Sequence, residues 1–359
     1  MIRRGLEVIA IAPRDDYADK LTAEGVTYVP LIMKAHGTSG IADLKTWQQL
    51  YRIYKAHRPD LAIHYTIKMN IYGSLACKWL GIRSISVVTG LGRTFQLSSF
   101  TQILINRLYK AATESNQEVW VLNTEDRDRL VKEHICSREK IFVLPSEGVN
   151  TRKFIGSNPK KEGRIFRFLF AGRLLHDKGI IDYVAAARKL LLTYPDVRCE
   201  VVGFVNPEDS MSVSLDDIST WQDEGAINYL GSHEDIRPFI ERADCIVYPS
   251  FYQEGISRIL MEAASMSRPI ITTDQVGCRD VVMHKYNGFL IPTKSVDSLV
   301  RAMKKMMAIS QSDRNVMGRL GRKLAVEKYD EDIIIQIYFN RLLTDFLVQD
   351  VFKEHPRSQ

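Results

Sequence analysis

The chain has 359 residues, of which 45% are hydrophobic and 26% are charged, and its formal net charge is +6. This length suits two domains of ordinary size, and the composition is globular, which excludes a disordered chain. No stretch approaches about 18 consecutive apolar residues, so we expect no membrane-spanning helix. Most of the excess positive charge lies in residues 1–150. Such a basic half suits a phosphorylated substrate or an acidic membrane surface, but an ordinary solvated surface explains the charge equally well.

The N-terminal stretch combines two arginines with an apolar run, as a short signal peptide does. Glu7 interrupts the run and no small-residue cleavage site follows, so we predict a strand at Leu6–Ala12 instead. The five cysteines lie far apart without a CxxC pair, which argues against a disulfide framework and against a zinc site. We expect reduced thiols in or near the core of a cytoplasmic protein.

Apolar runs of strand length alternate with amphipathic helical segments through the first half of the chain. After Leu6–Ala12, this pattern predicts strands at Leu61–His64, Ser84–Val88, Glu118–Leu122 and Ile141–Leu144, and helices at Asp43–His57, Asn70–Leu80, Ser99–Thr113 and Glu125–Glu133. The alternation is typical of a parallel sheet with helices on both faces.

A segment rich in Gly, Pro, Ser and charge, within Thr151–Arg167, breaks this pattern and predicts a linker. The alternation then resumes. It predicts strands at Phe168–Phe170, Cys199–Val202, Ile227–Leu230, Cys245–Tyr248 and Pro269–Thr273, and helices at Gly179–Tyr194, Glu234–Arg242, Ser257–Met266, Ser295–Ile309 and Glu331–Val351.

We therefore predict two doubly wound domains, residues 1–155 and 156–330, with a C-terminal helical segment, residues 331–359, that crosses back to the first domain. In such sheets, ligands bind outside the carboxyl ends of the strands. Two such edges facing each other would form a cleft between the domains.

The motif AGRLLHDKG, residues 171–179, follows a predicted strand directly and opens a helix. Gly172 permits a tight turn, and Gly179 permits close backbone approach. Arg173 and Lys178 place two cations beside a helix N-terminus, which already favours an anion, and together they suit a diphosphate. A surface turn with two solvated cations is the alternative for this motif by itself.

The sharper signal is YPSFYQEGISRILMEAASMSRPIITTD, residues 248–274. Glu254 lies on the turn after a strand beside Gly255, and Glu262 follows it with seven residues between. Glu262 stands in an apolar helix face, where a carboxylate needs partners. Sugar hydroxyls would supply these partners, and so would an ordinary backbone cap.

These motifs, together with NGFLIP and YLGSHEDIRPFIERADCIVYPS, resemble the retaining glycosyltransferases of family 4, which have the two-domain GT-B fold. The resemblance extends from about Leu6 to Leu343. It is closest to bacterial enzymes that extend lipid-linked oligosaccharides or build capsule and exopolysaccharide repeats.

The resemblance implies a role for each matching position. Arg173 and Lys178, after Gly172, would bind the donor diphosphate and stabilise the leaving group. Glu254 would contact the donor sugar hydroxyls. The remaining implied contacts are the backbone amides of Gly255, Ile256 and Ser257 with sugar and phosphate, and Glu262 with the ribose hydroxyls.

Two loops of the first half resemble the family's loops that face the cleft: HYTIKMNIYGS, residues 64–74, and VVTGLGRTF, residues 87–95. Gly90 and Gly92 would let the backbone approach a ligand. Phe95 stands where the dinucleotide motif GxGxxG needs its last glycine, so we expect no nicotinamide cofactor. His64 is a candidate site residue, although a packed histidine is the commoner outcome.

The chain departs from the family at its start. The family begins with a strand, a glycine-containing loop and a helix, whereas this sequence begins within that helix. Either the start is an internal Met or the protein is shortened, and the second case puts its activity in doubt.

Two further features have ordinary alternatives. The segment Arg93–Lys110 mixes apolar residues with cations, as a membrane-contacting helix does, but a helix packed on its own sheet is favoured. The sequences DRD, residues 126–128, and DED, residues 330–332, imitate a metal-binding DxD. We interpret both as solvated carboxylates of N-terminal helical turns and expect no metal site.

The sequence predicts a retaining hexosyltransferase that moves a hexose or N-acetylhexosamine from a nucleotide-diphosphate sugar, UDP being the expected nucleotide, to a saccharide or polyprenyl-diphosphate-linked saccharide. It would need no cofactor beyond this donor and would bind no nucleic acid. We expect a cytoplasmic location, and peripheral contact with the inner membrane face stays open. The alternative is a truncated, non-catalytic sugar-nucleotide-binding protein. A UDP-sugar epimerase would require an additional acid/base set, which we do not find in the sequence. A nicotinamide dehydrogenase is the weakest rival, because its fingerprint is absent.

Overall fold

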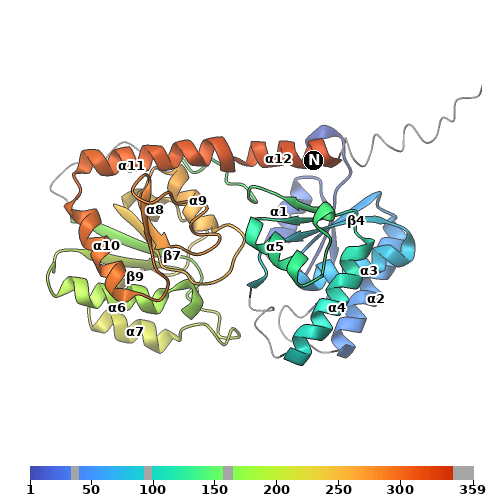
Figure 1. Ribbon diagram of the computed structural model, residues 1–359, viewed down its shortest axis with the longest axis horizontal. Helices are drawn as coiled ribbons and strands as arrows, with labels where there is room; N and C mark the ends of the chain where they lie inside the picture. The colour runs from blue at the N-terminus through green and yellow to red at the C-terminus, as the bar shows by residue number, and fades with distance from the viewer. Residues whose placement is uncertain (34–39, 93–98, 157–164, 343–359) are drawn as a thin grey trace, which may run out of the picture. The chain divides into compact units, whose positions relative to one another are not determined.

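The computed structural model describes residues 1–33, 40–92, 99–156 and 165–342. The chain divides into two compact units, the first with residues 1–89 and 94–143 and the second with residues 90–93 and 144–359 (Figure 1). Strands and helices alternate in both units, and every strand pairing is parallel. The predicted α/β class with Rossmann-like sheets is therefore confirmed.

The first unit contains a four-stranded sheet and a separate strand pair. The sheet has the order β3 (Leu61–Tyr65), β4 (Arg83–Val88), β5 (Glu118–Val121) and β6 (Ile141–Val143), and the pair consists of β1 (Ile9–Ala12) and β2 (Thr27–Pro30). The helices are α1 (Tyr17–Ala23), α2 (Gly40–His57), α3 (Ile67–Leu80), α4 (Ser99–Ser115) and α5 (Thr124–Lys132). Most of β4 and β5 is buried, as expected for parallel strands whose apolar runs are nearly continuous.

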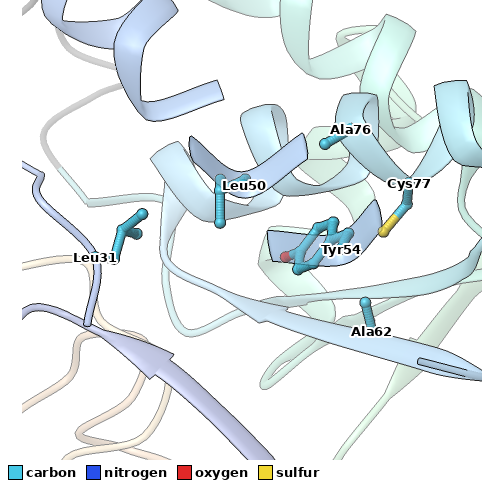
Figure 2. Close-up of a cluster of buried hydrophobic side chains, with 6 residues drawn as sticks. All are labelled: Leu31, Leu50, Tyr54, Ala62, Ala76 and Cys77. Carbon is cyan, nitrogen blue, oxygen red and sulfur yellow. The ribbon is translucent and has the colours of Figure 1, made fainter. Parts of the chain in front are cut away.

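A hydrophobic cluster joins α2 and α3 to β3 in this unit (Figure 2). Its fully buried members are Leu31, Leu50, Tyr54, Ala62, Ala76 and Cys77. Beside it lies a cavity of about 390 Å³, lined by residues of β1 and by all five residues of β3. These two strands do not pair with each other, so each has a free edge in the described sheets.

The second unit has one six-stranded sheet. Its order is β12 (Gly288–Ile291), β11 (Ile270–Thr273), β10 (Cys245–Tyr248), β7 (Arg167–Ala171), β8 (Arg198–Val202) and β9 (Asn228–Tyr229). The central strands β10 and β11 are buried along their whole length. This arrangement makes β11, β10 and β7 adjacent, so their carboxyl ends lie at one edge of the sheet.

Helices cover this sheet, and several begin with the caps that their sequences provide. They are α6 (Ile180–Leu191), α7 (Leu215–Asp223), α8 (Arg237–Arg242), α9 (Arg258–Ser265), α10 (Val296–Ala308), α11 (Gln311–Leu324) and α12 (Glu331–Arg341). Ser214 forms a capping box with Asp217 at the start of α7. Asp330 caps α12 by accepting a hydrogen bond from the backbone of Asp332.

Five elements were not predicted from the sequence: α1, β2, α7, β12 and α11. The first four are short, and α11 carries mostly polar residues with two glycines, which weakens its helical periodicity. All five cysteines are free and buried, as expected. Among the residues described, no helix is both long and apolar enough to cross a membrane.

Parts of three predictions lie outside the described residues. They concern the linker at 157–164, the start of the Arg93–Lys110 segment at 93–98, and the end of the C-terminal helix from 343 onward. The crossing of that helix to the first domain and the cleft between the domains stay predictions.

Candidate active site

Loops from three adjacent strands meet at the carboxyl edge of the second sheet. The loop after β7 contains Gly172 and Arg173 and enters a short 3-10 turn, His176–Lys178. The loop after β10 carries Glu254 and leads into α9. The loop after β11 contains Gly277. This edge is where parallel α/β sheets bind their ligands.

The turn after β7 depends on two glycines with positive φ. Gly172 has φ 143°, and Gly179, which ends the 3-10 turn and begins α6, has φ 84°. A Cβ atom on Gly179 would lie 2.2 Å from the carbonyl oxygen of Pro249, so the two loops approach too closely for any side chain there. Both glycines were predicted for a tight turn and a close approach, and the geometry has both features.

Lys178 and Glu254 form an ion pair at this edge. Lys178 Nζ lies 2.7 Å from Glu254 Oε2, and the two side chains are only 5% and 17% exposed. Two aromatic rings surround the ammonium group, with centroids 4.4 Å away for Tyr252 and 5.9 Å away for Tyr248. A cation and a carboxylate that are this strongly desolvated interact far more strongly than an exposed pair does.

The β10 loop is fastened to the β7 turn through one backbone carbonyl. The Asp177 carbonyl accepts hydrogen bonds from the backbone N–H groups of Phe251 and Tyr252, at 2.9 and 3.0 Å, and from the Ser250 hydroxyl at 3.3 Å. On its other side, the loop contacts Gly277, whose carbonyl accepts the backbone N–H of Ser257 at 2.9 Å. The positions of Lys178 and Glu254 are thus fixed by their own backbone neighbours.

Two charged side chains at this edge, Glu254 and Arg173, lack some of the polar partners that they could have. Glu254 Oε1 is buried and has no hydrogen-bond partner among the described residues. Arg173 is exposed, and its side chain makes no ion pair within the described part of the chain. Burial raises the pKa of Tyr248 well above its usual value, and the nearby Glu254 carboxylate raises it further. A polar, partly anionic ligand with hydroxyl groups would complement both the free oxygen and the free cation.

The second glutamate predicted for the site, Glu262, lies eight residues after Glu254, within α9. Glu262 is buried in α9, and its Oε1 accepts a hydrogen bond from Arg258 Nε at 3.2 Å. Burial raises the pKa of this carboxyl, and the Arg258 guanidinium partly opposes the shift. Glu262 therefore has a cationic partner as well as the burial expected from its place in an apolar face.

Gly90 and Gly92 belong to the second unit and lie against the β10 loop. A Cβ atom on Gly90 would be 2.8 Å from the backbone nitrogen of Gly255, and one on Gly92 would be 2.5 Å from the hydroxyl oxygen of Tyr252. Gly92 N–H donates to the Gln253 carbonyl at 3.2 Å. The structure thus brings these two predicted glycines next to the Glu254 loop.

His64 has a different environment, inside the first unit. It is buried in β3, where its ring nitrogens lie 3.0 Å from the Tyr54 hydroxyl and 3.1 Å from the Ser74 hydroxyl. Burial lowers its pKa to about 4. Gly73 packs so closely that a Cβ atom there would be 2.6 Å from the ring. Both nitrogens are satisfied internally, which favours the packed alternative for this residue.

The two DxD-like sequences have structural partners. DED begins α12, where Glu331 accepts from Asn150 and Asp332 pairs with Arg152 at 2.7 Å. In DRD, Asp128 is exposed and pairs with Arg127, as expected. The expectation of a solvated carboxylate was wrong for Asp126, which is buried because it exchanges hydrogen bonds with Asn123 at the start of α5. Within the described ranges, no group of three or more His, Cys, Asp or Glu is placed to hold a metal.

Sequence reasoning missed three contributors to this edge: Tyr252, Asp177 and Gly277. Asp177 acts through its backbone carbonyl, for which residue type carries no signal. Gly277 has φ 80°, and a Cβ atom there would lie 2.8 Å from the carbonyl oxygens of Glu254 and Gly255, a close approach that was not predicted from the sequence. Tyr252 stands two residues before Glu254, and we predicted no role for its side chain from the sequence.

Comparison with known proteins identifies the class to which this fold and site belong. Residues 150–324 match the family described as "Glycosyl transferases group 1", and residues 2–123 match "Glycosyl transferase 4-like". A solved Rickettsia africae glycosyltransferase is similar in structure, with TM-score 0.77 and 16% identity over 94% of this chain and 90% of that one. Anabaena HepE, solved in a complex with UDP, has TM-score 0.76 and 15% identity over 94% of this chain and 100% of its own. The fold is GT-B, and the protein is a glycosyltransferase.

Curated relatives narrow this class. The chain is 26% identical to the N,N'-diacetylbacillosaminyl-diphospho-undecaprenol alpha-1,3-N-acetylgalactosaminyltransferase of Campylobacter jejuni, over 96% of this chain and 92% of the relative. It is 23% identical to the capsular polysaccharide biosynthesis glycosyltransferase CapM of Staphylococcus aureus, over 82% and 79%. Over most of its length the chain is thus similar to bacterial glycosyltransferases, and its residues 150–324 match the group 1 family.

Proposed function

We propose that this glycosyltransferase moves a hexose or N-acetylhexosamine from a UDP-sugar to a saccharide carried on a polyprenyl diphosphate, with retention at the anomeric carbon, in the synthesis of a surface polysaccharide or lipid-linked oligosaccharide. The observation that carries the proposal is the buried Lys178–Glu254 pair, with Arg173 exposed nearby and Glu254 Oε1 unpartnered among the described residues. The names of the relatives and the UDP complex of a structural neighbour support the acceptor and the nucleotide.

In the proposed reaction, Arg173 and Lys178 bind the donor diphosphate and stabilise the negative charge that grows on it as it leaves. The backbone amides that follow Glu254 would add to this stabilisation, and Glu254 would bind sugar hydroxyls. Glu262 would bind the ribose hydroxyls. The bond from the anomeric carbon to the diphosphate breaks, the acceptor oxygen bonds to that carbon on the same face, and the acceptor proton passes to the departing diphosphate. No cofactor beyond the donor is required.

The test is a donor panel. The purified protein is incubated with UDP-, GDP- and dTDP-sugars, with and without polyprenyl-diphosphate saccharides, and the free nucleoside diphosphate is measured. We expect acceptor-dependent release from a UDP-sugar and its loss in Glu254→Ala and Lys178→Ala. NMR of the product would show the anomeric configuration of the donor retained. UDP binding without transfer to any acceptor would favour the non-catalytic alternative.

A cytoplasmic site of action at the inner membrane face completes the proposal, since polyprenyl-linked acceptors are membrane-bound. Helix α4 supports it, because Ile103 and Leu104 are 52% and 53% exposed and Arg107 and Lys110 are exposed on the same helix. Apolar and basic side chains together suit an anionic bilayer surface. We expect sedimentation with anionic vesicles and weaker sedimentation of Ile103→Ser/Leu104→Ser. Equal binding of both proteins would contradict this role for α4.

A further inference from the structure

The β10 loop carries one aromatic residue for which the proposed reaction has no role. Tyr252 lies two residues before Glu254, and its ring centroid is 4.4 Å from Lys178 Nζ. At this distance, the face of an aromatic ring attracts an ammonium group, and the attraction grows when the pair is desolvated. The Lys178 side chain is 5% exposed. The ammonium group therefore has two partners in the loop, one charged and one neutral.

The backbone that carries the Tyr252 ring is fastened to the backbone next to the lysine. Tyr252 N–H donates to the carbonyl of Asp177, the residue that precedes Lys178 in the chain. Gly179, the residue that follows Lys178, leaves no room for a side chain beside Pro249. The ring and the ammonium group therefore sit on two backbones that are locked together, which distinguishes this contact from a chance meeting of two surface side chains.

Binding of the donor requires Lys178 to change its partner. Lys178 is paired with Glu254, yet the proposed reaction needs the lysine at the diphosphate and the glutamate at the sugar hydroxyls. Lysine is a compact charge on a flexible stem, so once it leaves the carboxylate nothing in the ion pair fixes its direction. The Tyr252 ring attracts the ammonium group without competing with the phosphate for a hydrogen bond.

We propose that Tyr252 is the positioning residue of Lys178: its ring holds the ammonium group at the sheet edge while the group exchanges the Glu254 carboxylate for the donor diphosphate. This inference rests on the proposed function, since it takes Lys178 as the ligand of the diphosphate. It adds that Glu254 and the diphosphate are alternative partners of the Lys178 ammonium group. The Tyr252 ring contacts this group both before and after the donor binds.

The test measures the affinities of UDP and of UMP by calorimetry. Tyr252→Leu removes the π face and keeps an apolar side chain, whereas Tyr252→Phe keeps the face and removes the hydroxyl. We expect Tyr252→Leu to weaken UDP binding about tenfold, UMP binding to change less than about twofold, and Tyr252→Phe to resemble the wild type. The matched control is Phe251→Leu, because the neighbouring Phe251 ring lies 4.6 Å from a different cation, Lys294.

A coupling measurement separates positioning from packing. In a Lys178→Gln background, Tyr252→Leu should cause no further loss of UDP affinity, because the ring then has no ammonium group to hold. The positioning role is overturned if Tyr252→Leu binds UDP like the wild type, if Tyr252→Phe loses as much affinity, or if the loss persists without Lys178. A wild-type protein that binds no UDP would overturn the proposed donor itself, and the positioning role with it.

Discussion

The carboxyl edge of the second sheet and the β3 region of the first unit both carry buried polar residues, but their hydrogen-bond partners differ. His64 in β3 has both ring nitrogens satisfied by Tyr54 and Ser74. At the other edge, Glu254 keeps an oxygen without a partner among the described residues, and Arg173 is exposed on the loop after β7. A buried polar group with all its partners inside the protein stabilises the fold, whereas an incomplete set leaves interactions for a ligand. Burial alone therefore does not mark a site.

The largest expected effect is on catalysis, at the carboxyl edge of the second sheet, where the polar groups lack some of their partners. Lys178→Gln should lower kcat about 100- to 1000-fold, because it removes a cation placed to stabilise the leaving diphosphate. The measurement is acceptor-dependent UDP release, with circular dichroism to confirm that the variant is folded. Activity within a factor of three of the wild type would show that the pair is structural, as His64 is.

The next largest effect should come from disrupting the close packing of the β7 turn, at Gly179, against the β10 loop, at Pro249. Gly179→Ala should lower the free energy of unfolding by about 2–4 kcal/mol, because it places a Cβ at positive φ and against the Pro249 carbonyl. Urea denaturation measures the loss. Gly81→Ala is the matched control, since Gly81 has φ 67° and open space around it, and it should cost only about 1–2 kcal/mol. Equal losses in the two variants would mean that the close approach to Pro249 adds no strain.

The pH dependence of stability should report on the buried environment of His64, whose ring nitrogens both have hydrogen-bond partners. The pKa of His64 is about 4 in the folded chain and ordinarily 6.5, so below pH 6.5 the unfolded chain binds a proton that the folded chain does not. Stability contributed by the neutral ring is therefore present above pH 6.5 and falls as the pH drops toward 4, by up to about 1.4 kcal/mol per pH unit. Urea unfolding of the wild type and of His64→Gln across this range measures the difference. Parallel curves would contradict the assigned environment.

The smallest effects concern the DRD sequence, where the two aspartates differ in burial. Asp126→Ala should cost about 1–2 kcal/mol, because it removes the buried carboxylate oxygen that accepts a hydrogen bond from Asn123 Nδ2 at the start of α5. Asp128→Ala should leave the melting temperature unchanged within error, because the pair of this carboxylate with Arg127 lies at the surface. Thermal unfolding distinguishes the two. A larger loss at Asp128 would reverse the ranking.

The sequence predicted the parts of the fold that periodicity controls. The strand Cys245–Tyr248 was placed with both ends correct, because it is a short, fully apolar run bounded by charge and by Pro249. The segment Gly288–Ile291 was missed as a strand, since it begins with glycine and offers only three apolar residues. Separation of β1 and β2 from the four-stranded sheet depends on pairing across the chain, which local periodicity does not encode.

The candidate site was predictable where side-chain chemistry carries the signal. Lys178, Glu254 and Glu262 were found from charge, spacing and position after strands, and the structure brings the first two together. Asp177 was missed because it contributes through its backbone carbonyl. Tyr252 was missed because its contribution depends on the distance from its ring to Lys178, which only the folded loops define. His64 shows the opposite limit. This polar residue stands at the start of a promising loop, but its hydrogen-bond partners Tyr54 and Ser74 lie inside the first unit and belong to no motif.

The position of the active site is tested most directly by comparing Lys178, at the carboxyl edge of the second sheet, with His64, in the first unit, in the same assay. Acceptor-dependent UDP formation from a UDP-sugar would be measured for the wild type, for Lys178→Gln and for His64→Gln, each under conditions where the variant is folded. We expect transfer to be lost with Lys178→Gln and to stay within a few-fold of the wild type with His64→Gln. Transfer that survives the loss of Lys178 but not the loss of His64 would contradict the assignment of the active site to the carboxyl edge of the second sheet.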